Sequence, residues 1–134
     1  MLPLNLHHTA VAVHDLDAAL ERIRSMFGAE PLSREVIEDQ GVEEAMVPFG
    51  GSFLQVLMPL GEKTPVGRFL ERHGEGMHHV AIQVADIDSA LDHLRAEGSE
   101  VVDEAPRVGG GGNRIAFVHP RAFGGTLVEL IEVV

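Results

Sequence analysis

One segment of the chain occurs twice. Residues 8–20 read HTAVAVHDLDAAL, and residues 79–91 read HVAIQVADIDSAL. The positions that are identical in the two copies are His8/His79, Ala10/Ala81, Val13/Val84, Asp15/Asp86, Asp17/Asp88, Ala19/Ala90 and Leu20/Leu91. Because chance rarely produces such agreement, we infer an internal duplication, and each half of the chain must then build the same elements.

Each copy begins with a strand and continues into a helix. In residues 6–13 the β-branched side chains alternate with His8 and small residues, and the second copy repeats this pattern around His79. Successive side chains of a strand point to opposite faces, so the β-branched face is expected to pack on the helix. The face that carries the histidine has small or polar side chains, which suits a cavity better than a core.

The helices have matching start and stop signals. Asp15 and Asp86 are expected to cap the N-termini of two equivalent helices, and Gly28 and Gly98 follow their last residues. A third helix, at about 64–74, has a threonine cap and a proline in its first turn. This helix links the two halves of the chain.

The other segments are predicted to be strands, and both halves then read β-α-β-β-β. The expected elements are strands at 31–39, 42–49 and 52–58 in the first half, and a helix at 86–97, strands at 100–104, 114–119 and 126–133 and a loop at 106–113 in the second. This is an α+β arrangement in which two curved sheets can enclose a common cleft. We expect a single domain over residues 1–134, with module 1 at about 5–62 and module 2 at about 77–134.

Composition and charge exclude several classes of function. The 134 residues are 45% hydrophobic and 23% charged, which suits one globular domain, and the formal charge is −11. This charge argues against partners such as nucleic acids and anionic membrane surfaces. The sequence has no cysteine for thiolate chemistry. No apolar run approaches the roughly 20 residues of a membrane span, so we expect a cytoplasmic protein.

The duplication selects candidate metal ligands. His8 and His79 are equivalent positions of the repeat. The pattern fits two interpretations of this pair equally well, ligation of a metal ion or burial in a core. The last strand of each half reads FLQVL or LVELI, which places Gln55 and Glu129 at equivalent centres. A buried carboxylate needs a partner or a cation, although Glu129 could also face water on an edge strand. Two imidazoles, an amide oxygen and a carboxylate suit Co²⁺, Mn²⁺, Ni²⁺ or Zn²⁺.

Two further features are candidates for catalysis and substrate binding. Glu43 and Glu44 stand in a predicted strand, where alternation sends one carboxylate to each face. An inward Glu44 could act as a general base, although the pattern alone favours two solvated glutamates. The run Gly109–Gly112 lacks the residues of a nucleotide P-loop. With Arg107, Asn113 and Arg114 beside it, this run could hold phosphate or carboxylate oxygens.

These features together resemble the vicinal oxygen chelate superfamily and, within it, the methylmalonyl-CoA epimerase family. The resemblance runs from about His7 to Glu132. Its motifs are QGVEEAM at 40–46, QVLMPL at 55–60, TPVGRFLERHGEGMHHVA at 64–81, EAPRVGGGGNRIAFVHP at 104–120 and GGTLVEL at 124–130. The segment GEGMHH and the glycine loop that ends in NRIAFVHP are typical of the epimerase branch, whereas paired βαβββ modules occur throughout the superfamily.

The resemblance implies an isomerase that interconverts (2R)- and (2S)-methylmalonyl-CoA through an enolate, as a homodimer. The implied roles are metal ligation by His8, Gln55, His79 and Glu129, proton transfer by Glu44 and Glu129, and acyl-CoA binding by Gly112, Asn113 and Arg114. Co²⁺ is the expected ion, with Mn²⁺, Ni²⁺ or Zn²⁺ as alternatives. Two positions depart from the family pattern, because His7 replaces an aspartate and Met58 replaces a glutamate. Both are expected to tune the surroundings of the site rather than to remove it.

Three other functions are open to a protein of this superfamily. A glyoxalase I-like lyase would use similar ligands and would also transfer protons. A metal-free protein like the bleomycin-resistance members would only bind its ligand. An extradiol dioxygenase would need two histidines, one glutamate and Fe²⁺, and Gln55 argues against that set.

Overall fold

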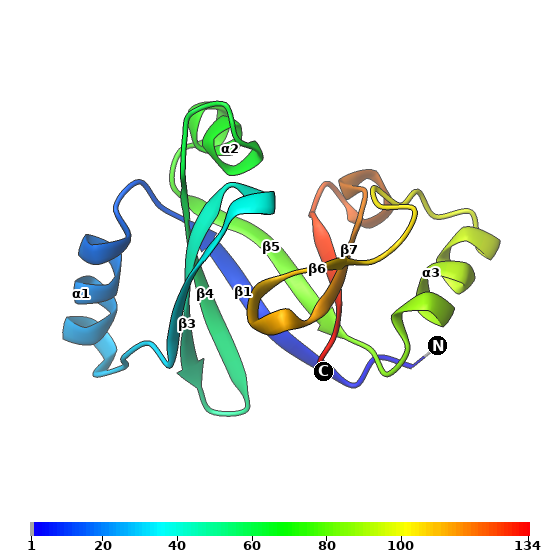
Figure 1. The fold of residues 1–134 in the computed structure, drawn as a ribbon, viewed down its shortest axis with the longest axis horizontal. Helices are drawn as coiled ribbons and strands as arrows, with labels where there is room; N and C mark the ends of the chain where they lie inside the picture. The colour runs from blue at the N-terminus through cyan, green and yellow to red at the C-terminus, as the bar shows by residue number, and fades with distance from the viewer. Residues whose placement is uncertain (1) are drawn as a thin grey trace. The chain divides into compact units, whose positions relative to one another are not determined.

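The computed structural model describes residues 2–134, and the chain forms two compact units. We call residues 8–78 the His8 unit. Residues 79–134, together with the described residues up to His7, form the His79 unit. The strands Asn5–Ala12 and Gly76–Gln83 each cross this boundary, and each is described below with the unit that contains its histidine, His8 or His79. The elements are coloured and labelled along the chain in Figure 1.

The His8 unit has four strands and two helices. Its elements are β1 (Asn5–Ala12), α1 (Leu16–Phe27), β2 (Ser33–Ile37), a 3₁₀ turn (Glu38–Gln40), β3 (Val42–Phe49), β4 (Ser52–Pro59) and α2 (Pro65–His73). The strand order is β2-β3-β4-β1, in which β1 and β4 are parallel and the other neighbours are antiparallel. Figure 1 shows α1 alongside β3 and β4.

The His79 unit repeats this architecture. Its elements are β5 (Gly76–Gln83), α3 (Ile87–Ala96), β6 (Arg107–Val108), a 3₁₀ turn (Gly110–Gly112), β7 (Arg114–Val118), a second 3₁₀ turn (Pro120–Phe123) and β8 (Val128–Glu132). The order is β5-β8-β7-β6, with β5 and β8 parallel. Two βαβββ modules are therefore confirmed.

In each unit, the strands bury one face against the unit's own helix. Val11 and Val13 of the first strand segment pack with Leu16 and Ile23 of α1, and in the His79 unit Val84 packs with residues of α3. The β-branched face thus packs on the helix, as predicted. On the opposite face of β1, the small residues Ala10 and Ala12 are fully buried and pack with Val66 and Leu70 of α2. This part of the face is therefore core, and the prediction of a cavity is wrong there.

One predicted strand is wrong. Residues 100–104 form only an isolated bridge, between Val101 and Val118, and a short strand occurs instead at Arg107–Val108, inside the predicted loop. The reason lies in the hydrogen bonds of Phe117. Its carbonyl accepts from the backbone of Val102, but its N–H donates to the side chain of Asp103. Because a side chain replaces the backbone acceptor, the ladder does not extend.

The helix caps follow the duplication. Asp15 accepts a hydrogen bond from the Ala18 N–H at 3.0 Å, and Asp86 accepts one from the Ser89 N–H at 3.1 Å. Of the helices within residues 2–134, none has the length and apolar character needed to cross a bilayer.

The side chain of Met58, on β4, contacts the N-terminus of α1. In the His79 unit, the carboxylate of Glu132 accepts from the Ile87 N–H at 2.9 Å, at the first residue of α3. At the equivalent place in the His8 unit, the sulfur of Met58 lies 3.4 Å from the Leu16 N–H. Met58 also packs with the α1 core, on the face of β4 away from Gln55. This departure from the family pattern therefore affects α1.

We predict that Met58→Glu stabilises the protein, because a carboxylate replaces a weak acceptor at the positive end of α1. The expected gain is about 0.3–1 kcal/mol in the free energy of unfolding, measured by urea denaturation. Met58→Gln is the matched control, since it supplies an oxygen acceptor without charge, and it should gain less. An unfolding free energy for Met58→Glu at or below that of the wild type would contradict the prediction.

Candidate functional site

In the His8 unit, His8 and Gln55 share one face of the sheet. Both side chains are buried, at 2% and 8% exposure. In the parallel pair β1–β4, Phe53 lies opposite His8 and Ala10 lies opposite Gln55. Paired residues of neighbouring strands point to the same side, and alternate residues of one strand also share a side. The parallel pairing therefore puts the imidazole and the amide on one face.

The His79 unit presents the same arrangement. Ala81 of β5 lies opposite Glu129 of β8, so that His79 and Glu129 share a face. Both are buried, at 3% and 4% exposure. The His79 Nε2 atom lies 3.4 Å from a Glu129 carboxylate oxygen. Each unit thus carries half of the ligand set that the sequence suggested.

The donor atoms fit a divalent cation. The amide nitrogen of Gln55 donates to the carboxylate of Glu44. Its amide oxygen is buried and has no hydrogen-bond partner among residues 2–134. A buried polar atom without a partner is costly, and an amide oxygen is a good ligand for a hard or borderline metal ion. Together with imidazole nitrogen and carboxylate oxygen, this set suits Co²⁺, Mn²⁺, Ni²⁺ or Zn²⁺.

Glu44 lies inside the protein, on the same face as Gln55. It is 4% exposed, and on β3 it stands two residues from Met46, which lies opposite Gln55. Glu43 points to the other face, where its carboxylate lies 2.7 Å from Arg34 Nε. The interpretation that both glutamates are solvated is therefore wrong for Glu44.

Burial controls the acidity of Glu44. Desolvation raises the pKa of its carboxyl group to about 7, the hydrogen bond from Gln55 opposes this rise, and the charge of Glu35 adds to it. Glu35 lies directly opposite Glu44 on the neighbouring strand β2. A carboxyl group that titrates near neutral pH can both accept and release a proton under ordinary conditions.

The arginine at the end of the glycine loop, Arg114, points to the face of the sheet opposite the candidate ligands. The Arg114 guanidinium is 3.0 Å from Asp88 of α3 and 3.5 Å from Glu132. Its side chain is thus on the α3 side of the sheet, away from His79. The Asn113 side-chain oxygen accepts from the backbone N–H of Val134, and Gly112 ends a 3₁₀ turn.

Phe117 was not among the residues predicted from the sequence to form the site. This residue lies opposite Glu129 on β7, and its ring meets the His79 imidazole edge-on, with 5.6 Å between the ring centres. The duplication could have revealed it, because Phe117 stands opposite Glu129 as Met46 stands opposite Gln55. Phe117 therefore supports the orientation of His79.

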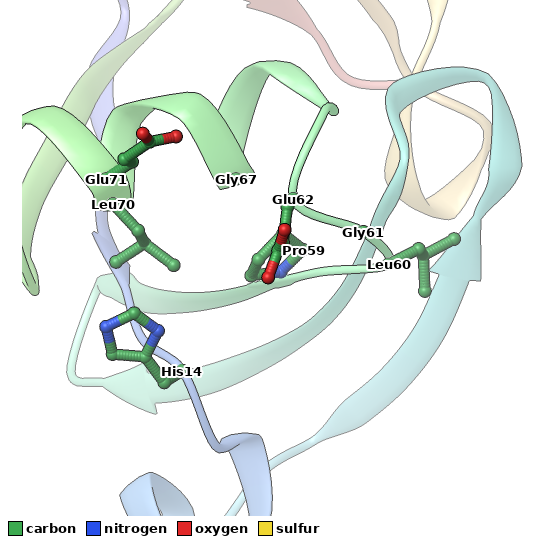
Figure 2. A pocket seen from close by; sticks show the side chains of 8 residues that line it. All are labelled: His14, Pro59, Leu60, Gly61, Glu62, Gly67, Leu70 and Glu71. Carbon is green, nitrogen blue, oxygen red and sulfur yellow. The ribbon is translucent and has the colours of Figure 1, made fainter.

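A separate pocket of about 520 Å³ lies in the His8 unit, between α2 and the end of β4 (Figure 2). The imidazole of His14 points into it, and two of its lining residues are the acids Glu62 and Glu71. None of the candidate ligands lines this pocket, nor does Glu44. Its acidic lining does not suit an anionic substrate.

Comparison with known proteins shows what this chain resembles. Residues 7–117 match the family described as the Glyoxalase/Bleomycin resistance protein/Dioxygenase superfamily. An ethylmalonyl-CoA/methylmalonyl-CoA epimerase of Cereibacter sphaeroides is 38% identical over 130 residues, which cover 96% of this chain and 97% of that protein.

Two solved structures are similar over nearly the whole chain. One is a variant of Streptomyces coelicolor methylmalonyl-CoA epimerase in complex with 2-nitronate-propionyl-CoA, and the other is a methylmalonyl-CoA epimerase in complex with methylmalonyl-CoA and NH4+. Each is 40% identical with a TM-score of 0.96, and each alignment covers 99% of this chain and 96% of the other.

Proposed function

Because the chain belongs to the Glyoxalase/Bleomycin resistance protein/Dioxygenase superfamily and, within it, to the methylmalonyl-CoA epimerase family, we propose that it interconverts (2R)- and (2S)-methylmalonyl-CoA. The observation that carries this proposal is the buried carboxyl group of Glu44, in contact with Gln55. Epimerisation removes a proton from one side of a carbon and returns one to the other side. It therefore needs a second acid–base group besides Glu129, and Glu44 fits that role.

The proposed metal ligands are His8, Gln55, His79 and Glu129, with Co²⁺ as the expected ion and Mn²⁺, Ni²⁺ or Zn²⁺ as alternatives. The equivalent burial of each half of the set supports this assignment. The amide oxygen of Gln55, which has no hydrogen-bond partner within the described residues, supports it as well. When bound, the ion would supply a Lewis acid that stabilises negative charge on the substrate's thioester oxygen.

Glu44 and Glu129 are the proposed acid–base pair. One carboxylate accepts the proton from the carbon between the thioester and the carboxylate, which leaves a planar enolate. The other group, in its protonated form, donates to the opposite side of that carbon and inverts it. The two glutamates belong to different repeats, and their positions in the repeats are not equivalent. This supports a separate role for each.

The other proposals concern the substrate and the state of the protein. Gly112, Asn113 and Arg114 are proposed to contact the acyl-CoA, through backbone N–H groups of the loop and the charge of the guanidinium. We also propose a homodimer, which rests on the family, and a cytoplasmic location, which rests on the sequence analysis.

We predict one divalent ion per chain, detected by elemental analysis of protein purified without chelator. His79→Ala should lose the ion, because one of the two imidazole ligands is gone. His93→Ala is the control, since His93 is exposed on α3 and should leave the metal content unchanged. Full occupancy in a His8→Ala/His79→Ala double variant would contradict the ligand set.

We predict that Glu44→Gln keeps its metal but loses about 10²–10⁴-fold in epimerisation, since it cannot accept a proton. The measurement is interconversion of methylmalonyl-CoA in D₂O, with deuterium incorporation followed separately in each stereoisomer. The variant should still exchange one stereoisomer by means of Glu129. The matched control is Glu43→Gln, on the other face of the same strand.

The same assay tests the function itself. A wild-type protein that incorporates deuterium into methylmalonyl-CoA behaves as an epimerase, whereas a glyoxalase would turn over a hemithioacetal and a binding protein would do neither. A loss below about tenfold for Glu44→Gln would show that another group takes the proton, since general-base removal costs more than this.

We predict that Arg114→Ala raises KM more than it lowers kcat, provided that the guanidinium contacts the substrate equally in the ground and transition states. Arg121→Ala is the control, because Arg121 is a 76% exposed arginine of the same unit. The alternative is that Arg114 only stabilises the fold, through its ion pairs with Asp88 and Glu132. A lower melting temperature with an unchanged KM would therefore contradict the binding role.

A further inference from the structure

We propose that Arg107 binds an anionic oxygen group of the acyl-CoA and that Asp103 positions its guanidinium for this contact. The inference rests on the proposed function, because it concerns the substrate of the same site. The sequence grouped Arg107 with Asn113 and Arg114 beside a glycine run that could hold phosphate or carboxylate oxygens, whereas the family resemblance implied acyl-CoA binding by Gly112, Asn113 and Arg114.

Arg107 lies on the face of the sheet that carries His79 and Glu129. The strands of the His79 unit contain two arginines, Arg107 and Arg114. Arg107 is opposite Ile115, and Ile115 packs with Ala81 on the His79 side. Arg114 is on the α3 side, so that within the described strands of this unit Arg107 is the one arginine on the candidate site face.

Aromatic packing links Arg107 to the candidate ligands. Its guanidinium carbon lies 5.9 Å from the centre of the Phe117 ring, within the range of a cation–π contact. The same ring meets His79 edge-on. A single aromatic ring therefore separates the guanidinium from a proposed metal ligand.

Asp103 fixes this arrangement with its two carboxylate oxygens. One accepts the Phe117 N–H at 2.8 Å, and the other lies 3.2 Å from Arg107 Nε. The Asp103 side chain is only 15% exposed. It thus ties the backbone that carries the ring to the guanidinium above the ring, which reduces the entropy that Arg107 loses when it binds a ligand.

The terminal nitrogens of Arg107 are available for a ligand. Within residues 2–134, Asp103 is the one carboxylate paired with this side chain, and the contact uses Nε. The side chain remains 44% exposed. Two guanidinium N–H groups side by side match the oxygens of a carboxylate or a phosphate. In a chain with a formal charge of −11, such a cation offsets the repulsion of an anionic substrate.

The anionic group has two possible sources in the substrate, the malonyl carboxylate and the phosphates of CoA. Isothermal titration calorimetry on the metal-loaded protein separates them with three ligands. These are methylmalonyl-CoA, CoA itself, and methylmalonyl-pantetheine, which carries the carboxylate but no phosphate. Arg107→Gln should bind methylmalonyl-CoA about tenfold more weakly or worse, as expected when a charged hydrogen bond is lost.

The ligand that weakens together with methylmalonyl-CoA identifies the group that Arg107 contacts. Arg107→Lys should restore part of the affinity, since it retains the charge but not the paired N–H groups. Arg121→Gln, which makes the same charge change on an exposed arginine, should bind like the wild type.

Asp103→Asn tests the positioning role. It keeps an oxygen acceptor for the Phe117 N–H but removes the charge beside Arg107. It should weaken binding in the wild-type background and have no further effect in Arg107→Gln, which a purely structural residue would not show. Equal weakening in both backgrounds would overturn this role.

The test distinguishes failure of the inference from failure of the function. If the wild type exchanges deuterium into methylmalonyl-CoA and Arg107→Gln binds all three ligands as tightly as the wild type does, the inference alone is overturned. If the wild type neither binds these ligands nor exchanges deuterium, the proposed function falls and the inference falls with it.

Discussion

The parallel pairing of the first and last strands in each repeat is the constraint on which the candidate site depends. In β1–β4 this pairing places Ala10 opposite Gln55, and in β5–β8 it places Ala81 opposite Glu129. In both pairs the histidine stands two residues before the alanine on the same strand, so that it shares a face with the glutamine or glutamate. A shift of one residue would turn every ligand to the helix-covered face, because side chains alternate along a strand. The packing of β-branched residues on α1 and α3 opposes such a shift, since it would expose them. The hydrophobic core therefore fixes the position of the polar site.

The two repeats have kept this geometry and diverged in charge. Where the His8 unit has Gln55, the His79 unit has Glu129. Where the first has Glu44 opposite Leu57, the second has Ile115 opposite Ile131. One strand further out, Glu35 opposite Glu44 corresponds to Arg107 opposite Ile115. The duplicated scaffold thus provides equivalent positions for the proposed metal ligands. The differences between the repeats provide inequivalent positions for the proposed acid–base pair, Glu44 and Glu129.

The sequence predicted the elements that depend on local signals and on the duplication. The helix caps at Asp15 and Asp86 follow from local spacing, and the equivalence of Gln55 and Glu129 follows from the duplication. The shared faces of His8 with Gln55 and of His79 with Glu129 depend in addition on the parallel register of distant strands. The failed strand at 100–104 depends on a long-range contact, because the Asp103 side chain takes the Phe117 N–H. The burial of Glu44 and the position of Arg114 on the α3 side could not be predicted from the sequence either. The alternation of a strand shows that neighbouring residues point to opposite faces, but it does not show which of the two faces is buried.

The burial of Glu44 shows how one contact can serve both stability and chemistry. A desolvated carboxyl group opposite another glutamate is unfavourable in its charged form, which is why its pKa rises to about 7. The amide N–H of Gln55 offsets part of that cost. Because the amide nitrogen of Gln55 donates to Glu44, its oxygen must point elsewhere, and that oxygen has no hydrogen-bond partner in the described part of the chain. The contact therefore orients the amide oxygen of Gln55, a proposed metal ligand, and holds Glu44, the proposed base, next to it. An uncharged residue at position 44 would remove the cost of burial but would also free the amide to rotate.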